Sequence, residues 1–231
     1  ALVRWLHPQR GLLMPGTFIQ TAEETGLIRE LGLWTLDAAC AQLASWKACG
    51  LHPGRIAVNV SALQFRDQRL PQVLQTAMQT YDIQPGELEL ELTESALMVN
   101  SSSTMPLLEL LKQRGVILKV DDFGTGPSSL SYLQRCPVDV LKIDQSFVRA
   151  VATDPADATI TSTIVQMARA LNLTTIAEGV ETTEQMQLLA SYGCNRMQGH
   201  LFSQAIEPEL LERLLSAPPF WWMRQAKPTA P

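Results

Sequence analysis

The stretch that decides the fold is Val116-Ile-Leu-Lys-Val-Asp-Asp-Phe-Gly-Thr-Gly-Pro-Ser-Ser129. Its start, Val116–Val120, is mostly apolar and β-branched, which predicts a short buried strand. Neighbouring strand residues point to opposite faces, so the Asp121 and Asp122 that follow can converge only where the regular pleat breaks. Two converging carboxylates suit a hard cation such as Mg²⁺. An Asp- and Gly-rich stretch is also typical of a solvated loop. The Asp122-Phe-Gly run is not that of a kinase, because no His-Arg-Asp loop precedes it.

The same pattern, an apolar strand with polar residues at its end, recurs along the chain. It is found at Ile56–Val60 with Asn59, at Leu88–Leu92 with Glu91 and Glu94, at Val140–Ile143 with Lys142 and Asp144, and at Thr174–Ala177 with Glu178 and Glu181. With helical segments between such strands, the chain predicts a (β/α)₈ TIM-like barrel whose polar strand ends share one rim. Two further strands are expected, Ala1–Trp5 with Arg4 near its end and a brief one before Gln198. Since a closed barrel needs eight strands, we expect the first of them to precede Ala1.

Helices are predicted between these strands from apolar residues at three- and four-residue spacing. They cover Pro15–Ile28 in part, Gly32–Lys47, Leu70–Tyr81, Met105–Arg114 after a Ser101–Thr104 cap, Ser128–Arg135, Asp154–Leu171, Thr182–Tyr192 and Glu207–Leu215. The apolar stripe on Gly32–Lys47 is interpreted as core. We expect one domain over residues 1–217 and a separate C-terminal tail over 218–231, either a packed or frayed terminus or a partner-docking segment.

Composition narrows the class of protein. The 231 residues are 46% hydrophobic and 18% charged with a net charge of −5, which favours a globular enzyme over a DNA-, RNA- or membrane-surface-binding protein. The four cysteines lack Cys-x-x-Cys spacing and the three histidines are scattered, so neither a zinc site nor a disulfide framework is expected. Reduced thiols indicate a cytoplasmic domain, although upstream segments of a longer protein could attach it to a membrane.

The predicted rim would collect several acids, an amide and a lysine. Its members are Asn59, Glu91, Asp121, Asp122, Lys142, Glu178 and Gln198. Taken singly, each is more typical of a turn former, a cap or a snorkelling side chain. Taken together they match a phosphodiesterase with two Mg²⁺ or Mn²⁺ ions about 4 Å apart. Asp121 is the carboxylate best placed to bridge both ions.

With these residues in this order, the chain resembles the EAL-domain cyclic di-GMP phosphodiesterases. The matching stretches span nearly the whole chain in the family's order: Ala1–Trp5, Val58–Ser61, Glu89–Ser95, Asp121–Gly126, Leu141–Asp144, Ala177–Thr182 and Gln198-Gly199. The resemblance implies hydrolysis of cyclic di-GMP to linear 5′-pGpG, a homodimer, and upstream sensory or GGDEF modules.

Residue roles follow from the same resemblance. It implies that the metal ligands are Asn59, Glu91, Asp121, Asp122 and Glu178. Lys142 would position the attacking water, so the catalytic residues are expected to be Lys142, Asp121 and Glu178. Arg4 would bind a substrate phosphate and Gln198 would support the site. Glu94 would hold the loop after Asp122, while Glu181 and Asp144 would lie behind the ligands.

The chain departs from the family pattern in two places. The family has a metal-binding Glu directly before the position of Ala1, so that ligand is expected from outside the chain. Pro127 stands where the family usually has an aromatic residue, and proline restricts φ and removes an N–H. We therefore expect Pro127 to alter the mobility of this loop and its coupling to a dimer.

Two other functions compete with hydrolysis. A non-catalytic cyclic di-GMP receptor would usually lack some ligands or the lysine, whereas all those expected within this chain are present. An enolase-like barrel also places acids and a lysine at strand ends, but the Asn59 strand and the Asp121-Asp122 pair fit it poorly. The residue before Ala1 would discriminate best between the enzyme and the receptor.

Overall fold

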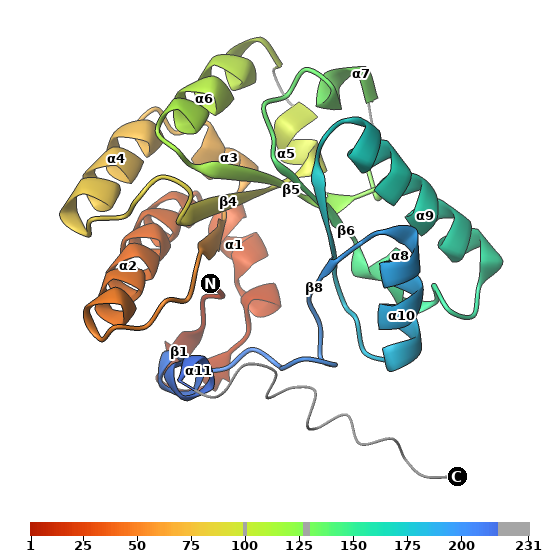
Figure 1. Cartoon of the computed structure of the whole chain (residues 1–231). Coiled ribbons are helices and arrows are strands. Elements are labelled where there is room, and N and C mark those ends of the chain that lie inside the picture. The colour runs from red at the N-terminus through yellow and green to blue at the C-terminus, as the bar shows by residue number, and fades with distance from the viewer. Residues whose placement is uncertain (99–100, 127–129, 217–231) are drawn as a thin grey trace.

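Six parallel strands form one curled sheet in which each strand lies beside the next along the chain (Figure 1). In the computed structural model, which describes residues 1–98, 101–126 and 130–216, they are β3 (Ile56–Asn59), β4 (Leu88–Thr93), β5 (Ile117–Phe123), β6 (Val140–Ile143), β7 (Thr174–Ala177) and β8 (Arg196–Met197). This sequential order is that of a (β/α) barrel and confirms the predicted fold class. Within the described chain no ladder joins β3 to β8, so the sheet is open.

The N-terminal segment differs from the prediction. The predicted strand Ala1–Trp5 is wrong, because β1 (Trp5–His7) pairs antiparallel with β2 (Gly11–Leu13) in a hairpin. The His7 ring closes its turn, with Nδ1 accepting hydrogen bonds from the backbone N–H groups of Gln9 and Arg10. Residues before the hairpin lie beside the sheet, since the Ala1 ammonium donates a hydrogen bond to the Ala57 carbonyl of β3.

Helices surround the sheet (Figure 1). They are η1 (Pro15–Thr17), α1 (Ile19–Glu24), α2 (Ile28–Ala48), α3 (Ala62–Phe65), α4 (Leu70–Thr80), α5 (Glu94–Met98), α6 (Ser101–Gln113), α7 (Leu130–Leu133), α8 (Gln145–Arg149), α9 (Pro155–Ala170), α10 (Thr183–Tyr192) and α11 (Pro208–Leu215). The helix starts predicted at Asp154 and Thr182 are confirmed, since these residues cap α9 and α10, and each side chain accepts a hydrogen bond from the first turn of its helix. Helix α6 already begins at Ser101, within its predicted cap. Pro127 and the expected tail 218–231 lie outside the described residues.

Alternate residues of the central strands have different surroundings. Leu88, Leu90 and Leu92 of β4 are fully buried in the apolar core, as are Leu118 of β5 and Leu141 of β6. The residues between them are charged yet buried, namely Glu89, Glu91, Lys119 and Lys142. Because side chains alternate across a strand, these charges all face the inside of the curled sheet. The fold therefore buries a set of charges where a barrel usually has apolar layers.

Gly199 is required by a close backbone contact after β8. A Cβ atom there would lie 2.1 Å from the carbonyl oxygen of Val180 and 2.3 Å from its nitrogen. This contact is fixed, since Val180 N–H donates to the Gln198 carbonyl at 3.0 Å and Leu201 N–H donates to the Val180 carbonyl at 3.0 Å.

We therefore expect Gly199→Ala to lower the free energy of unfolding by about 1–3 kcal/mol, the usual cost of overpacking. Urea denaturation followed by circular dichroism measures it. Gly16→Ala is the matched control, because a Cβ at Gly16 meets nothing within 4 Å. Equal unfolding midpoints for Gly199→Ala and the unchanged chain would show that the backbone contact is not tight.

Candidate active site

An irregularity near the end of β5 brings the two adjacent aspartates together. The strand runs through both acids to Phe123, rather than ending at Val120 as predicted, and its pairing with β6 shifts between Val120 and Phe123. Asp122 adopts a left-handed backbone with φ of 52°, which Asp tolerates better than most residues. As a result, carboxylate oxygens of Asp121, Asp122 and Glu178 all lie within 4.8 Å of one another.

Lys142 lies at the centre of these acids. Its Nζ is 2.8 Å from Asp121 Oδ1, 2.8 Å from Glu178 Oε1 and 3.0 Å from Glu91 Oε2. The residue is only 3% exposed. Burial by itself would lower the pKa of Lys142, but the three carboxylates outweigh it and hold the pKa above its ordinary value. In this arrangement Lys142 is therefore a charged ammonium.

A second buried lysine, Lys119, was not singled out from the sequence. It lies opposite Glu91 in the β4–β5 register, and its Nζ is 3.3 Å from Glu91 Oε1. It also forms an ion pair with Glu89. On the side nearer the surface, Glu89 Oε1 lies 3.4 Å from a guanidinium nitrogen of Arg55. The signal that could have identified Lys119 is the one used for Lys142, a lysine inside an apolar run.

The cluster carries more negative than positive charge, and the pKa values of two of its acids, Asp122 and Glu178, are raised. Five carboxylates, those of Glu89, Glu91, Asp121, Asp122 and Glu178, surround two lysines. Burial, reinforced by the charges of Asp121 and Glu91, raises the pKa of Glu178 to about 7 despite the opposing effect of Lys142. Burial also raises the pKa of Asp122, with the charges of Asp121 and Asp144 adding to it.

Glu91 behaves in the opposite way. Burial would raise its pKa, but the ammonium groups of Lys142 and Lys119 outweigh this effect and lower it. Glu91 is therefore held as a carboxylate, whereas at Asp122 and Glu178 burial outweighs the nearby charge of Lys142. An all-oxygen set with excess negative charge fits a hard divalent cation.

Asn59 ends β3 opposite Glu91 in the register, as the strand-end pattern predicted. Both residues line a cavity of about 280 Å³, together with Thr93 and Ser61. Its other wall comes from the N-terminal helices and is mostly apolar, through Pro15, Ile19, Ile28 and Leu31. Through Glu91, the acid cluster thus borders a hollow whose lining is mostly apolar.

Two further acids lie behind Asp121 and Asp122. Glu94, at the start of α5, is buried, and its Oε2 accepts a hydrogen bond of 3.2 Å from the Gly124 N–H. Its Oε1 has no hydrogen-bond partner within the described chain. Asp144 shares a hydrogen bond with Asp122 and accepts one of 2.9 Å from the Ser146 N–H, which caps α8. Glu94 therefore contacts the loop after Asp122, and Asp144 contacts Asp122 directly.

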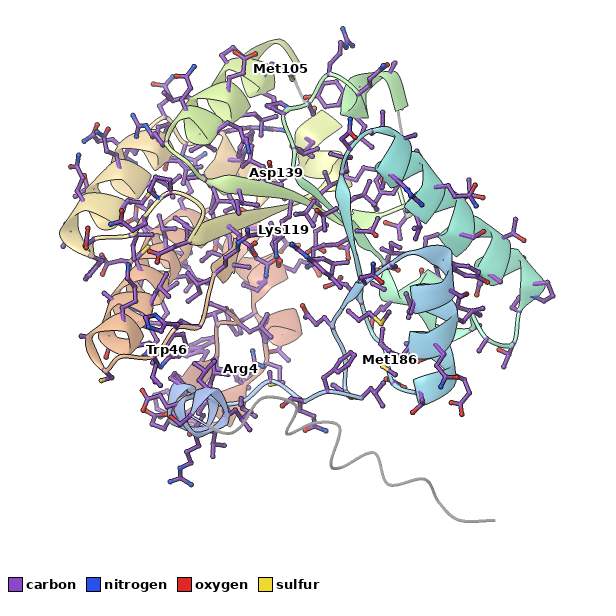
Figure 2. All side chains as sticks on the ribbon, in the orientation of Figure 1. Arg4, Trp46, Met105, Lys119, Asp139 and Met186 are labelled. Carbon is purple, nitrogen blue, oxygen red and sulfur yellow. The ribbon has the colours of Figure 1, made fainter. Side chains whose placement is uncertain are left out.

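The remaining predicted residues lie at different distances from this cluster. Gln198 is exposed, and its backbone bonds to Ala177 and Val180 place it next to the Glu178 turn. The side chain of Glu181 is exposed, and its backbone N–H bonds to Gln185 Oε1. Arg4 lies beside α11, well away from Lys119 (Figure 2), in a hollow of about 520 Å³ shared with Trp34 and Leu215. Their assigned roles stay predictions.

The chain is similar to a known protein family over most of its length. The EAL domain family model matches residues 1–205. The bifunctional diguanylate cyclase/cyclic di-GMP phosphodiesterase MucR of Pseudomonas aeruginosa is 46% identical over 211 residues, which cover 91% of this chain and 31% of MucR. The cyclic di-GMP phosphodiesterase PdeR of Escherichia coli is 40% identical over 227 residues, covering 98% of this chain and 33% of PdeR.

Two solved structures superpose closely on this chain. The PaMucR phosphodiesterase in complex with c-di-GMP superposes with a TM-score of 0.88 at 46% identity, covering 91% of this chain and 85% of that one. The EAL enzyme Bd1971 bound to cAMP and cyclic di-GMP gives a TM-score of 0.87 at 30% identity, covering 93% of this chain and 59% of that one.

Two facts bear on the context of the domain. The chain spans about a third of the length of the curated relatives it matches. Across the described residues, no helix has the length and apolar character needed to cross a bilayer.

Proposed function

This chain belongs to the EAL domain family, and from that premise we propose that it hydrolyses cyclic di-GMP to linear 5′-pGpG with the help of two divalent metal ions. The observation that carries the proposal is the Lys142 ammonium held by Glu91, Asp121 and Glu178, next to the paired Asp121 and Asp122. A hydrolytic site of this kind needs both a cation-binding set of oxygens and a group that orients water. The relatives named as cyclic di-GMP phosphodiesterases support the choice of substrate.

The residues that would hold the metals are Asn59, Glu91, Asp121, Asp122 and Glu178. Their oxygens suit Mg²⁺ or Mn²⁺, and the excess of carboxylates over lysines leaves charge for the cations to balance. When bound, such ions would supply Lewis acidity toward the phosphate and activate a water molecule.

Lys142 would act on the water rather than on the metals. Its three N–H donors face Glu91, Asp121 and Glu178, and a carboxylate neutralised by a cation would free one donor to hold a water in line with the scissile phosphorus. While Glu91, Asp121 and Glu178 are unneutralised, they keep the pKa of Lys142 high. Were those charges balanced, burial would remain as the main influence and would lower the pKa of Lys142, so that the ammonium could release its proton to solvent and the neutral amine could then accept the proton of that water.

The substrate would enter the cavity beside Asn59 and Glu91. Its apolar wall, which includes Pro15, Ile19 and Leu31, suits a flat purine base, while the phosphates would lie toward the acids. We propose that Gln198 borders this site from the Glu178 side. Arg4 would reach a phosphate only after leaving its hollow near α11.

Glu94 is expected to matter for turnover without binding metal. In Glu94→Ala, the Gly124 N–H loses its acceptor, so the loop after Asp122 is no longer held. We expect hydrolysis to fall about tenfold or more while Mn²⁺ affinity stays near its original value. Chromatographic rates and Mn²⁺ titration measure the two effects.

Glu109→Ala, on the exposed side of α6, is the matched control and should change neither quantity. Loss of Mn²⁺ binding in Glu94→Ala would instead make Glu94 part of the metal site.

The assembly of the whole protein is also a proposal. The greater length of the relatives supports fusion of this domain to sensory or GGDEF modules, in a protein whose EAL domain works in the cytoplasm. We propose a homodimer coupled through the loop after Asp122. Sedimentation that finds only monomers at full activity would argue against this coupling.

The proposed reaction is tested by incubating the full-length natural protein with cyclic di-GMP and Mg²⁺ or Mn²⁺. Chromatography should show 5′-pGpG accumulating, and excess EDTA should stop its formation. Formation of pGpG at an undiminished rate in EDTA would contradict the metal requirement.

A further inference from the structure

Lys119 is a buried charge that the reaction proposed above does not use. It is 6% exposed and lies on β5 two residues before Asp121, on the same face of the strand. Lysines are almost never buried without a partner. Lys119 has two, since its Nζ forms an ion pair with Glu89 and lies 3.3 Å from Glu91 Oε1.

The two lysines divide the Glu91 carboxylate between them. Lys119 contacts Oε1, and Lys142 contacts Oε2 at 3.0 Å. Lys142 also binds Asp121 and Glu178, whereas the ion pairs of Lys119 among the described residues are those with Glu89 and Glu91. Lys119, itself paired with Glu89, thus holds one oxygen of Glu91, while Lys142, which also binds Asp121 and Glu178, contacts the other.

The charges around Lys119 are arranged as a chain. Arg55 contacts Glu89, Glu89 pairs with Lys119, Lys119 contacts Glu91, and Glu91 contacts Lys142. An ion pair that served only to fill the interior would be complete with Glu89 and Lys119 alone. The additional contact to Glu91 connects this pair to the acids of the site.

We propose that Lys119, supported by Glu89, is a positioning residue for metal binding. It fixes Glu91 Oε1, so that Oε2 stays on the side of Lys142, which also binds Asp121 and Glu178, and is presented to a divalent cation without first having to be ordered. Loss of a group that orients a metal ligand in this way typically weakens metal binding by about 10–100-fold. This inference rests on the proposed function, because it takes Glu91 as a metal ligand.

The test is Lys119→Met, which keeps an unbranched side chain one atom shorter and removes its charge. Mn²⁺ affinity of the full chain, measured by electron paramagnetic resonance without substrate, should weaken about 10–100-fold. Hydrolysis should fall at low Mn²⁺ and recover when Mn²⁺ is raised, because the reacting groups are intact. A purely structural role for Lys119 would not produce recovery by metal.

Two further variants keep the result interpretable. Lys112→Met removes a lysine whose partner, Asp139, lies outside the site, and should bind Mn²⁺ normally. Glu89→Gln combined with Lys119→Met removes both buried charges, so it should melt near the original temperature and still bind Mn²⁺ weakly. Unchanged or tighter Mn²⁺ binding in the Lys119 variants would overturn this inference alone. An unaltered protein that binds no Mn²⁺ would overturn the proposed function as well.

Discussion

Lys142→Ala should lower the rate of cyclic di-GMP hydrolysis by about 10²–10⁴-fold, the usual contribution of a group that positions or deprotonates a nucleophile. The ammonium lies within 3.0 Å of Glu91, Asp121 and Glu178, so the mutation removes the donor that would face the water. Because Lys142 is not a metal ligand in this account, the dinucleotide should still bind in Ca²⁺. Calorimetry measures that binding, and chromatography of pGpG measures the rate.

The control for this prediction is Lys112→Ala, which removes a half-buried lysine paired with Asp139 outside the site. It should hydrolyse at the original rate. If Lys142→Ala does so too, the role given to Lys142 is wrong. If Lys142→Ala loses both binding and turnover, the lysine instead holds the site together.

Asp121→Asn should abolish metal binding and hydrolysis together. Asp121 shares the 4.8 Å cluster with Asp122 and Glu178, and its Oδ1 contacts Lys142 at 2.8 Å. Asparagine keeps the shape of the side chain but removes the charge and one acceptor oxygen. We expect Mn²⁺ affinity to fall about 100-fold, the upper end of what a supporting group costs, because Asp121 would be a ligand itself. Mn²⁺ titration and the pGpG assay measure both losses.

Asp82→Asn is the matched control, since Asp82 is exposed and its φ of 49° suits asparagine equally well. It should leave Mn²⁺ binding and hydrolysis intact. Asp121→Asn that binds Mn²⁺ as tightly as the unchanged chain would remove Asp121 from the ligand set.

Much of the sheet could be predicted from the sequence. Strands β6 and β7 match their predicted bounds because each is a short apolar run ended by a polar residue or a turn. The hairpin of β1 and β2 was missed, since its turn depends on hydrogen bonds to the His7 ring that residue preferences do not reveal. The end of β5 was also placed too early, because an irregular ladder continues the strand through Asp121 and Asp122.

Part of the candidate site could also be predicted from the sequence. Strand ends alone indicated that Glu91, Asp121, Lys142 and Glu178 would meet, and the structure places them together. Lys119 and Glu89 were missed, because their pairing depends on the register of β4 against β5. Arg4 lies in another hollow, a placement that depends on the path of the N-terminal segment rather than on strand pattern.

The measurement that tests the account most directly pairs binding with turnover in the full-length natural protein. Cyclic di-GMP binding is measured by calorimetry in Ca²⁺, and its conversion is followed by chromatography after Mn²⁺ replaces Ca²⁺. The account predicts tight binding in the first condition and complete conversion to 5′-pGpG in the second. Binding in both conditions with no pGpG formed would contradict it and would identify the domain as a cyclic di-GMP receptor.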